Sequence, residues 1–238
     1  MSTPPQTAYT RYALCLAGWA LSAVLAIFCY QHLLRTNLRF WTGIVTHGTP
    51  ARREIALTFD DGPSPLWTPL ESDSLRRHGA RGTFMLVGEQ ATYYPEITAR
   101  LIREGQEVEN HSLTHPYPNL TKFPAKDISK EIRDSAGILR QITGQPIRFF
   151  RPPGGGVNDD VLGVLEQTHT RMAWWSANMG DWRSPPPALT EHLLSASLRP
   201  GLIVLMHCRG NTVEALENFL AGSERGDYTY ATLSTIIR

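Results

Sequence analysis

From Ile55 to the C-terminus, short apolar runs alternate with amphipathic stretches, and this alternation constrains the fold more than any other feature. The runs predict strands, whereas the stretches between them have the periodicity of helices. The predicted strands are Ile55–Phe59, Gly82–Val87, Gln106–Glu109, Arg148–Phe150, Arg171–Trp175, Leu202–Met206 and Tyr228–Ala231. The predicted helices are Pro69–Arg77, Glu96–Glu104, Ala125–Thr143, Asp159–Glu166, Leu189–Ser197 and Val213–Leu220. Strands that alternate with helices predict an α/β fold with a parallel sheet, and this number of units favours a barrel over an open sheet.

The N-terminal part of the chain has a different composition. Residues 12–34 contain no Asp, Glu, Lys or Arg, and about 20 such residues span a bilayer. They predict a transmembrane signal-anchor helix over 12–34, preceded by a short tail over 1–11. A linker over 35–53 and one folded domain over 54–238 would follow. A buried helix of a soluble protein and the apolar region of a signal peptide are alternatives. Arginines after the segment favour a cytoplasmic domain, but long domains translocate largely regardless of charge, so we expect a single-pass protein with an extracytoplasmic domain.

Overall composition excludes some classes of function. The chain has 238 residues, of which 42% are hydrophobic, enough for one sizeable core. A formal net charge of +1 gives no electrostatic basis for binding nucleic acid. Two of the three cysteines lie in the N-terminal apolar segment, so neither a disulfide framework nor a cysteine zinc motif is expected. The sequence does not define an oligomeric state.

Most predicted strands are followed by residues that can carry chemistry. They are Asp60 and Asp61, His111 and His115, Arg151, Asp181 with Trp182, and His207. A parallel barrel would bring the ends of its strands to one rim, where barrel enzymes have their active sites. Taken singly, each has a structural alternative: a turn or helix cap for Asp-Gly-Pro, a solvated loop for Asp181, and a strand-end histidine for His207.

The segment His111-Ser-Leu-Thr-His115 has imidazoles at a spacing that can place both on one metal ion. Pro116 disfavours helical geometry at His115, so a single turn or a loop is expected. Two imidazoles and one carboxylate are a common ligand set that leaves a position open for water and substrate. A divalent cation would also explain how two adjacent carboxylates, Asp60 and Asp61, remain ionised side by side. Chance spacing without metal is the alternative.

In these motifs the chain closely resembles the NodB-type polysaccharide deacetylases, carbohydrate esterase family 4, from roughly Ile55 to Ile237. Thr58-Phe-Asp-Asp-Gly-Pro63 matches the first motif of the family and His111–His115 matches the second. Arg151-Pro-Pro-Gly-Gly155 is similar to the third motif, Asp181-Trp182 to the fourth, and Leu205-Met-His207 to the fifth. The order of all five is that of the family. The resemblance implies a distorted, incomplete (β/α) barrel.

The resemblance also implies a role for each residue. Asp60 would be the general base, and His207 the general acid. Asp61, His111 and His115 would hold a divalent metal, most simply Zn²⁺, although Co²⁺, Mn²⁺ or Ni²⁺ would also suit the ligands. Arg151 would hold Asp60, and Asp181 would pair with His207. Gly154 would offer a backbone N–H to the oxyanion, while Trp182 and Leu205 would form walls of the acetyl pocket.

The implied function is removal of N-acetyl groups from the sugars of a polysaccharide, either a chitin-like oligomer or peptidoglycan. Two alternatives remain: an amidase or deformylase of the same fold that acts on a lipid-linked or small substrate, and a non-catalytic carbohydrate-binding protein. The sequence departs from the family at Gly154, where an aromatic is usual, and at Cys208, where Asp is common. Glu71-Ser-Asp73 also places polar residues in a helix stretch that is ordinarily apolar.

Overall fold

The computed structural model describes residues 22, 25–27, 43–222 and 225–238. The chain divides into two compact units, Met1–Gly43 and Ile44–Arg238. In the first unit, residues 22 and 25–27 are helical and exposed. The predicted anchor over 12–34 lies almost entirely outside the described residues. None of the described helices combines the length and apolar character that crossing a bilayer requires.

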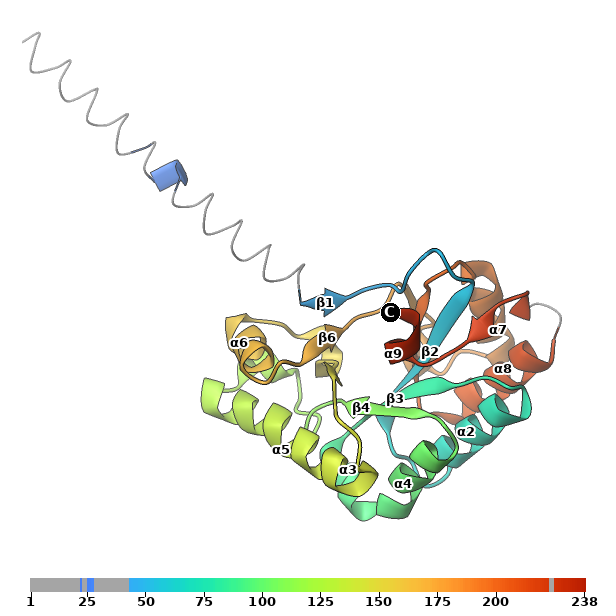
Figure 1. The fold of residues 1–238 in the computed structure, drawn as a ribbon, viewed down its shortest axis with the longest axis horizontal. Coiled ribbons are helices and arrows are strands. Elements are labelled where there is room, and N and C mark those ends of the chain that lie inside the picture. The colour runs from blue at the N-terminus through green and yellow to red at the C-terminus, as the bar shows by residue number, and fades with distance from the viewer. Residues whose placement is uncertain (1–21, 23–24, 28–42, 223–224) are drawn as a thin grey trace, which may run out of the picture. The chain divides into compact units, whose positions relative to one another are not determined.

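The second unit is built around one parallel sheet (Figure 1). Within its described residues, eight strands follow one another in the order β1-β6-β5-β4-β3-β2-β8-β7, and β9 pairs with β2 as a ninth. Their bounds are β1 Ile44–Val45, β2 Glu54–Gly62, β3 Gly82–Leu86, β4 Glu107–Asn110, β5 Phe149–Phe150, β6 Arg171–Ala173, β7 Ala177–Asn178, β8 Ile203–His207 and β9 Thr229–Tyr230. The path ends at β1 and β7 without pairing them, so the sheet is a curled, incomplete barrel.

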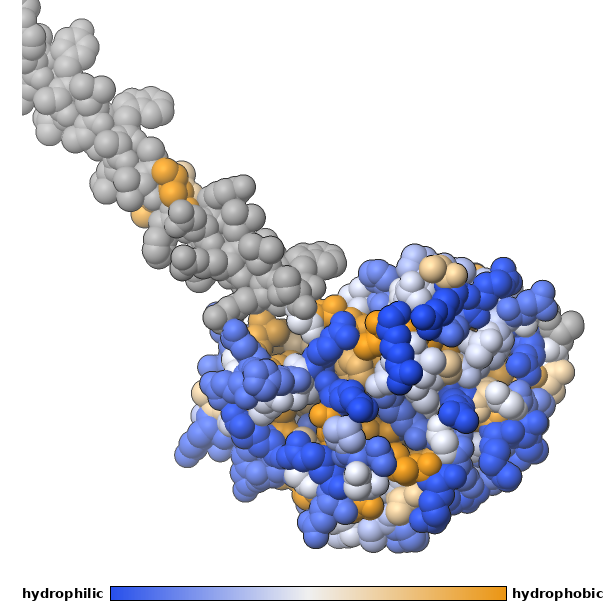
Figure 2. Space-filling view, in the orientation of Figure 1, coloured by the Kyte–Doolittle hydropathy of each residue, from blue (hydrophilic) through white to orange (hydrophobic). Residues whose placement is uncertain are grey.

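Helices follow most strands and cover the outer face of the sheet (Figure 1). The α-helices are α2 Trp67–Arg77, α3 Gly88–Tyr93, α4 Pro95–Arg103, α5 Ala125–Thr143, α6 Asp159–Gln167, α7 Pro187–Ser197, α8 Gly210–Ala221 and α9 Leu233–Ile236. Three short 3₁₀ helices lie in loops: η1 Leu120–Lys122, η2 Pro153–Gly155 and η3 Asp181–Arg183. The surface of the unit in this view is mainly hydrophilic, with hydrophobic residues in smaller groups between charged ones (Figure 2).

The alternation of side chains along β2 explains how the barrel is filled. Ile55, Leu57 and Phe59 pack in the core between the sheet and the helices. Ala56 belongs to a separate interior cluster, which includes residues of β1, β3, β5, β6, β8 and α9. Because side chains of a strand alternate between its faces, Thr58 and Asp60 follow Ala56 onto the interior face. The same alternation in β8 places Leu205 and His207 on the interior face with Ile203.

Most of the predicted elements are present, with ends shifted by a few residues. The sequence analysis did not identify β1, β7, α3 or α9, each of which has six residues or fewer. β1 lies in the stretch assigned to the linker over 35–53, yet it pairs in parallel with β6 through Ile44 and Val45. The compact unit therefore begins at Ile44 rather than at residue 54. A two-residue strand has no periodicity to detect, which explains this difference.

Candidate active site

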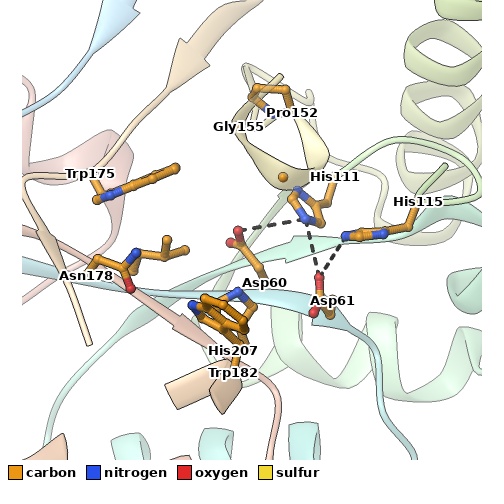
Figure 3. Close-up of a pocket in the computed structure, with 12 residues that line it drawn as sticks. Asp60, Asp61, His111, His115, Pro152, Gly155, Trp175, Asn178, Trp182 and His207 are labelled. Carbon is orange, nitrogen blue, oxygen red and sulfur yellow. Dashed lines mark ion pairs between the residues drawn. The ribbon is translucent and has the colours of Figure 1, made fainter. Parts of the chain in front are cut away.

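The carboxyl ends of the strands surround a cavity of about 380 Å³ (Figure 3). This volume lies in the usual range for small-molecule sites. Eight of the ten predicted site residues line the cavity, Gly154 through its backbone. The other two, Arg151 and Asp181, form hydrogen bonds with Asp60 and His207, which line it. The lining residues are Asp60, Asp61, His111, His115, Pro152, Gly154, Gly155, Trp175, Asn178, Trp182, Leu205 and His207.

A bulge in β2 turns both adjacent carboxylates toward this cavity. Neighbouring side chains of a regular strand point to opposite faces, so Asp60 and Asp61 would not share a site there. The pairing with β3 slips between Phe59 and Gly62, where three steps along β2 match two along β3. Asp61 takes a φ of 70° at the slip, a left-handed conformation that is unfavourable for most non-glycine residues. The backbone strain at Asp61 therefore accompanies its placement beside Asp60.

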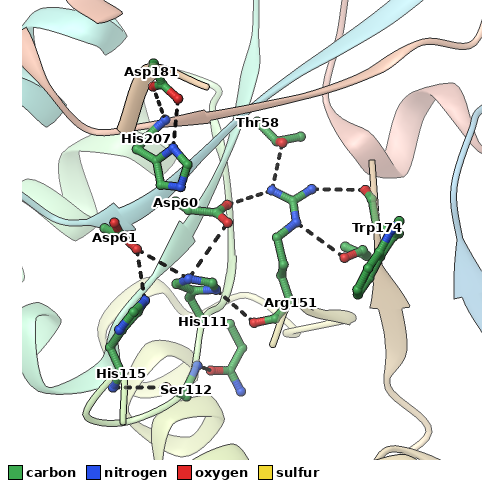
Figure 4. Close-up of polar contacts among 12 residues, drawn as sticks. Thr58, Asp60, Asp61, His111, Ser112, His115, Arg151, Trp174, Asp181 and His207 are labelled. Carbon is green, nitrogen blue, oxygen red and sulfur yellow. Dashed lines mark hydrogen bonds and ion pairs between the residues drawn. The ribbon is translucent and has the colours of Figure 1, made fainter. Parts of the chain in front are cut away.

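Asp60 is held by a buried arginine (Figure 4). Arg151 is fully buried on the interior side of the sheet, and Asp60 is only 4% exposed. Arg151 Nη1 donates to Asp60 Oδ1 at 2.6 Å and to Thr58 Oγ1 at 2.8 Å. Its remaining donors reach the carbonyl oxygens of Ala173 and Trp174. The pair thus has the additional hydrogen bonds that a buried ion pair requires, and Asp60 Oδ2 stays free of Arg151.

The two histidines lie in a loop whose backbone is strained and firmly held. His111–His115 contains no helix, and Ser112 and His115 have φ values of 68° and 56°. Glu131, on α5, accepts hydrogen bonds from the N–H groups of Leu113 and Thr114, both at 2.9 Å, and from the Thr114 hydroxyl at 2.8 Å. Glu131 was not predicted from the sequence, because it lies 16 positions beyond His115 on a helix of ordinary amphipathic pattern.

The orientation of His111 leaves a lone pair facing a carboxylate. His111 Nδ1 lies 2.8 Å from the carbonyl oxygen of Arg151, which can only accept, so Nδ1 carries the proton. In the neutral imidazole, Nε2 then has no proton, and it points at Asp61 Oδ1 at 3.4 Å. His115 Nε2 lies 3.3 Å from the same oxygen. Both contacts are longer than the 2.7–2.9 Å or so of a charge-assisted hydrogen bond.

These distances fit a shared metal ion. The three ligand atoms lie within 4.8 Å of one another. In a tetrahedral site with bonds of about 2.0–2.2 Å, two ligand atoms are about 3.3–3.6 Å apart. Burial raises the pKa of Asp61, but hydrogen bonds and charge from the two imidazoles, when these are protonated at Nε2, outweigh burial and hold that pKa well below its ordinary value. An ionised carboxylate and two inward-facing nitrogens make a possible metal site, and His111 has the backbone acceptor typical of a ligating imidazole.

His207 is organised by a second buried carboxylate. Asp181 is fully buried, and its Oδ1 lies 2.8 Å from His207 Nδ1. Asp181 Oδ2 accepts hydrogen bonds from the His207 backbone N–H at 2.7 Å and the Thr212 hydroxyl at 2.6 Å. Burial lowers the pKa of His207, but Asp181 and the charges of Asp60 and Asp61 outweigh this and raise it above its ordinary value. His207 is opposite Asp60 in the register of β2 and β8, so the two groups face one cavity.

The remaining predicted residues form the walls of the cavity. Leu205 is nearly buried on β8, whereas Trp182 is 47% exposed. Gly154 has a φ of 61°, which glycine adopts without strain, and its N–H makes no backbone hydrogen bond within the described part of the chain. Trp175 and Asn178 also line the cavity and were missed. Their only signal was their position: Trp175 is the last residue of the predicted strand Arg171–Trp175, and Asn178 follows that strand.

Cys208 and Glu71 form a buried polar contact outside the cavity lining. Both are buried, and Glu71 Oε1 accepts the Arg209 backbone N–H at 3.2 Å. Burial raises the pKa of Glu71 and of the Cys208 thiol well above their ordinary values. The polar residues of α2 therefore have partners: Ser72 donates to Glu104 at 2.6 Å, and Asp73 pairs with Arg100 at 2.8 Å.

A search of known proteins agrees with this geometry. The family model described as polysaccharide deacetylase matches residues 47–173, more than half of the chain. The chain belongs to the polysaccharide deacetylase family. The resemblance noted in the sequence is thereby confirmed, and the family supports a deacetylase activity.

Two curated relatives indicate the range of the family. Peptidoglycan-N-acetylmuramic acid deacetylase PdaC of Bacillus subtilis is 39% identical over 66% of this chain, which spans about a third (33%) of that protein. A peptidoglycan-N-acetylglucosamine deacetylase of Bacillus cereus is 32% identical over 87% of this chain and 98% of its own. Other relatives are named chitooligosaccharide deacetylases.

A solved structure adds a useful contrast. A mutant of a Bacillus anthracis CE4-family pseudoenzyme, with restored enzymatic activity, superposes with a TM-score of 0.75 and 26% identity, over 82% of this chain and 71% of its own. The fold of this family is therefore compatible both with activity and with its loss, so the side chains at the rim decide between them.

Proposed function

We propose that this protein is a metal-dependent hydrolase that removes N-acetyl groups from the amino sugars of a polysaccharide. The substrate classes are those of the relatives, peptidoglycan and chitin-like oligomers. The observation that carries the proposal is the convergence of three potential metal ligands and two acid–base groups on one cavity. Family membership alone would not distinguish an enzyme from a pseudoenzyme.

The protein's own residues divide the work of amide hydrolysis. Asp61, His111 and His115 would hold the cation, which when bound would polarise the acetyl carbonyl and acidify water. Asp60 takes the proton of the attacking water through the oxygen not bound to Arg151. The free N–H of Gly154 is available to the oxyanion. His207, protonated with the help of Asp181, donates a proton to the departing amine, which is too basic to leave as an anion.

Zinc is the simplest cation for two imidazoles and a carboxylate, although Co²⁺, Mn²⁺ and Ni²⁺ also bind such ligands. Trp182 and Leu205 would bound the space for the acetyl methyl group. Deformylase or amidase activity on a lipid-linked or small substrate has no separate support in the cavity. A non-catalytic carbohydrate-binding role is disfavoured by the complete set of acid, base and ligand residues.

The test is acetate release by purified full-length protein from N-acetylglucosamine oligomers and from peptidoglycan. We expect release that a chelator abolishes and that Zn²⁺ or another divalent ion restores. Metal analysis of Asp61→Ala provides the control, because this variant should lose both metal and activity. Activity that persists after complete metal removal would contradict the proposal.

We further propose that the domain acts outside the cytoplasm on a single-pass anchor over residues 12–34. Support comes from the uncharged length of that segment and from the cell-wall substrates that the relatives' names print. Protease accessibility of the domain in intact cells, compared with permeabilised cells, tests this proposal. Protection in intact cells would contradict it.

A further inference from the structure

A second groove adjoins the active cavity and has no role in the proposed chemistry. Its volume is about 440 Å³, and it shares Asn178 and Trp182 with the active cavity. Both shared residues are seen on one side of the site in Figure 3. The groove is lined by Asn178, Met179, Gly180, Trp182, Arg183, Pro185, Leu189 and Leu193. A polymeric substrate extends beyond the sugar that reacts. A groove that adjoins the cavity could therefore bind the next sugar of the same chain.

Arg183 gives this groove a definite charge. Among the described residues that line the groove, it is the only charged one. Its guanidinium carbon lies 4.6 Å from the centroid of the Trp182 ring, and Arg183 is exposed. Within the described residues, its side chain makes no hydrogen bond and no ion pair. The guanidinium of Arg183 therefore contacts an aromatic ring but pairs with no carboxylate of the protein. A guanidinium can form two parallel hydrogen bonds to a carboxylate, so Arg183 could bind one on a ligand.

The rest of the lining suits a sugar ring. Pro185, Leu189 and Leu193 offer apolar surface, and Leu189 is 48% exposed, whereas Met179 is buried. A pyranose presents C–H faces that pack on such surface and hydroxyls that remain in water. The groove combines an apolar floor with one unpaired cation.

We propose that this groove binds the sugar next to the one that is deacetylated, and that Arg183 pairs with a carboxylate on that sugar. The inference rests on the proposed function. The ligand class is an acidic glycan, such as a peptide-free strand of alternating N-acetylglucosamine and N-acetylmuramic acid, in which the lactyl carboxylate of muramic acid is free. Arg183 then makes the protein prefer this strand to neutral oligomers of N-acetylglucosamine.

Direct binding tests the groove independently of activity. Calorimetric titration compares a peptide-free tetrasaccharide of the alternating strand with the same glycan whose lactyl carboxylates are converted to amides. We expect the acidic glycan to bind about two- to fivefold more tightly, the range for an exposed ion pair. Arg183→Gln should abolish this preference and Arg183→Lys should retain part of it. The matched control is Arg140→Gln, an exposed arginine of α5 that lines a different pocket.

The outcomes are separable. A preference that high salt suppresses and that only Arg183→Gln abolishes supports the groove. Equal binding of both glycans by the unaltered protein, or a preference that survives in Arg183→Gln, overturns it. Acetate release is measured on the same samples. Its absence would refute the proposed function, while the binding result would still decide the groove.

Discussion

The two halves of the site differ in how their charges are balanced. On one side, Asp60 with Arg151 and Asp181 with His207 form short contacts of 2.6 and 2.8 Å within the protein. On the other side, Asp61, His111 and His115 face one another at 3.3 and 3.4 Å. In the first half, each charge has a partner within the protein. In the second half, the backbone is strained and the three side chains are spaced so that a cation could bind between them.

This difference separates the two kinds of role. The paired half orients Asp60 and His207 and sets their charge state before reaction, so that each can take or give a proton at a defined position. The metal half holds ligand atoms apart, which a hydrogen-bonded arrangement would not do. The comparison predicts that substitutions in the first half change turnover and stability, whereas those around the second change metal affinity.

The largest expected effect is on turnover. Asp60→Ala or His207→Ala should lower kcat by about 10²–10⁴-fold, the usual contribution of one general acid or base. Metal content should be unchanged, because neither residue is among the three clustered side chains that could hold a metal ion. Steady-state acetate release with metal analysis of the same samples measures both. Loss of both metal and turnover in these variants would contradict the separate roles of the two halves.

A large effect on stability is expected at Arg151. Arg151→Met leaves the buried Asp60 carboxylate unpaired and should lower the free energy of unfolding by about 3–5 kcal/mol. Adding Asp60→Asn removes that charge and should recover a substantial part of the loss. Urea unfolding of both variants and of Asp60→Asn completes the cycle. A double variant as unstable as Arg151→Met would show that the ion pair is not the cause.

The sequence predicted the chemistry of both halves better than the backbone that positions them. Motif spacing singled out the residues of both halves, and the family resemblance implied their roles as ligands, acid and base. These residues meet at one cavity because they follow predicted strands and a parallel sheet brings strand ends together. The bulge at Asp61 was not predictable, since it arises from the register of β2 against β3 rather than from local composition. Glu131 and Trp175 were missed for the same reason: their importance comes from tertiary contacts. The short strands β1 and β7 had too few residues to show a pattern.

A smaller effect, on metal affinity, is expected from the loop His111–His115. Glu131→Gln removes the charge that holds the N–H groups of Leu113 and Thr114, so the loop should lose its fixed form. Metal affinity should fall about 10–100-fold, as for other groups that orient ligands. Competition with a chromogenic chelator measures it, and turnover at saturating metal should recover. Asp134→Asn, also on α5 and exposed, is the matched control. Equal affinities in both variants would exclude a positioning role for Glu131.

The smallest effect is a displacement of the pH profile, and it tests the pair of Asp181 and His207. His207 has a raised pKa because Asp181 and nearby carboxylates outweigh burial, so its acid form persists to higher pH. Activity that needs this form is present below the pKa of His207 and is lost as the pH rises through it. Asp181→Asn removes the main charge partner, so the pKa falls and the alkaline limb of kcat/KM should move to lower pH. Thr212→Val, which deletes only a hydrogen bond to Asp181, keeps the charge and should move the limb less. An unmoved limb in Asp181→Asn would mean that the group titrating there is not His207.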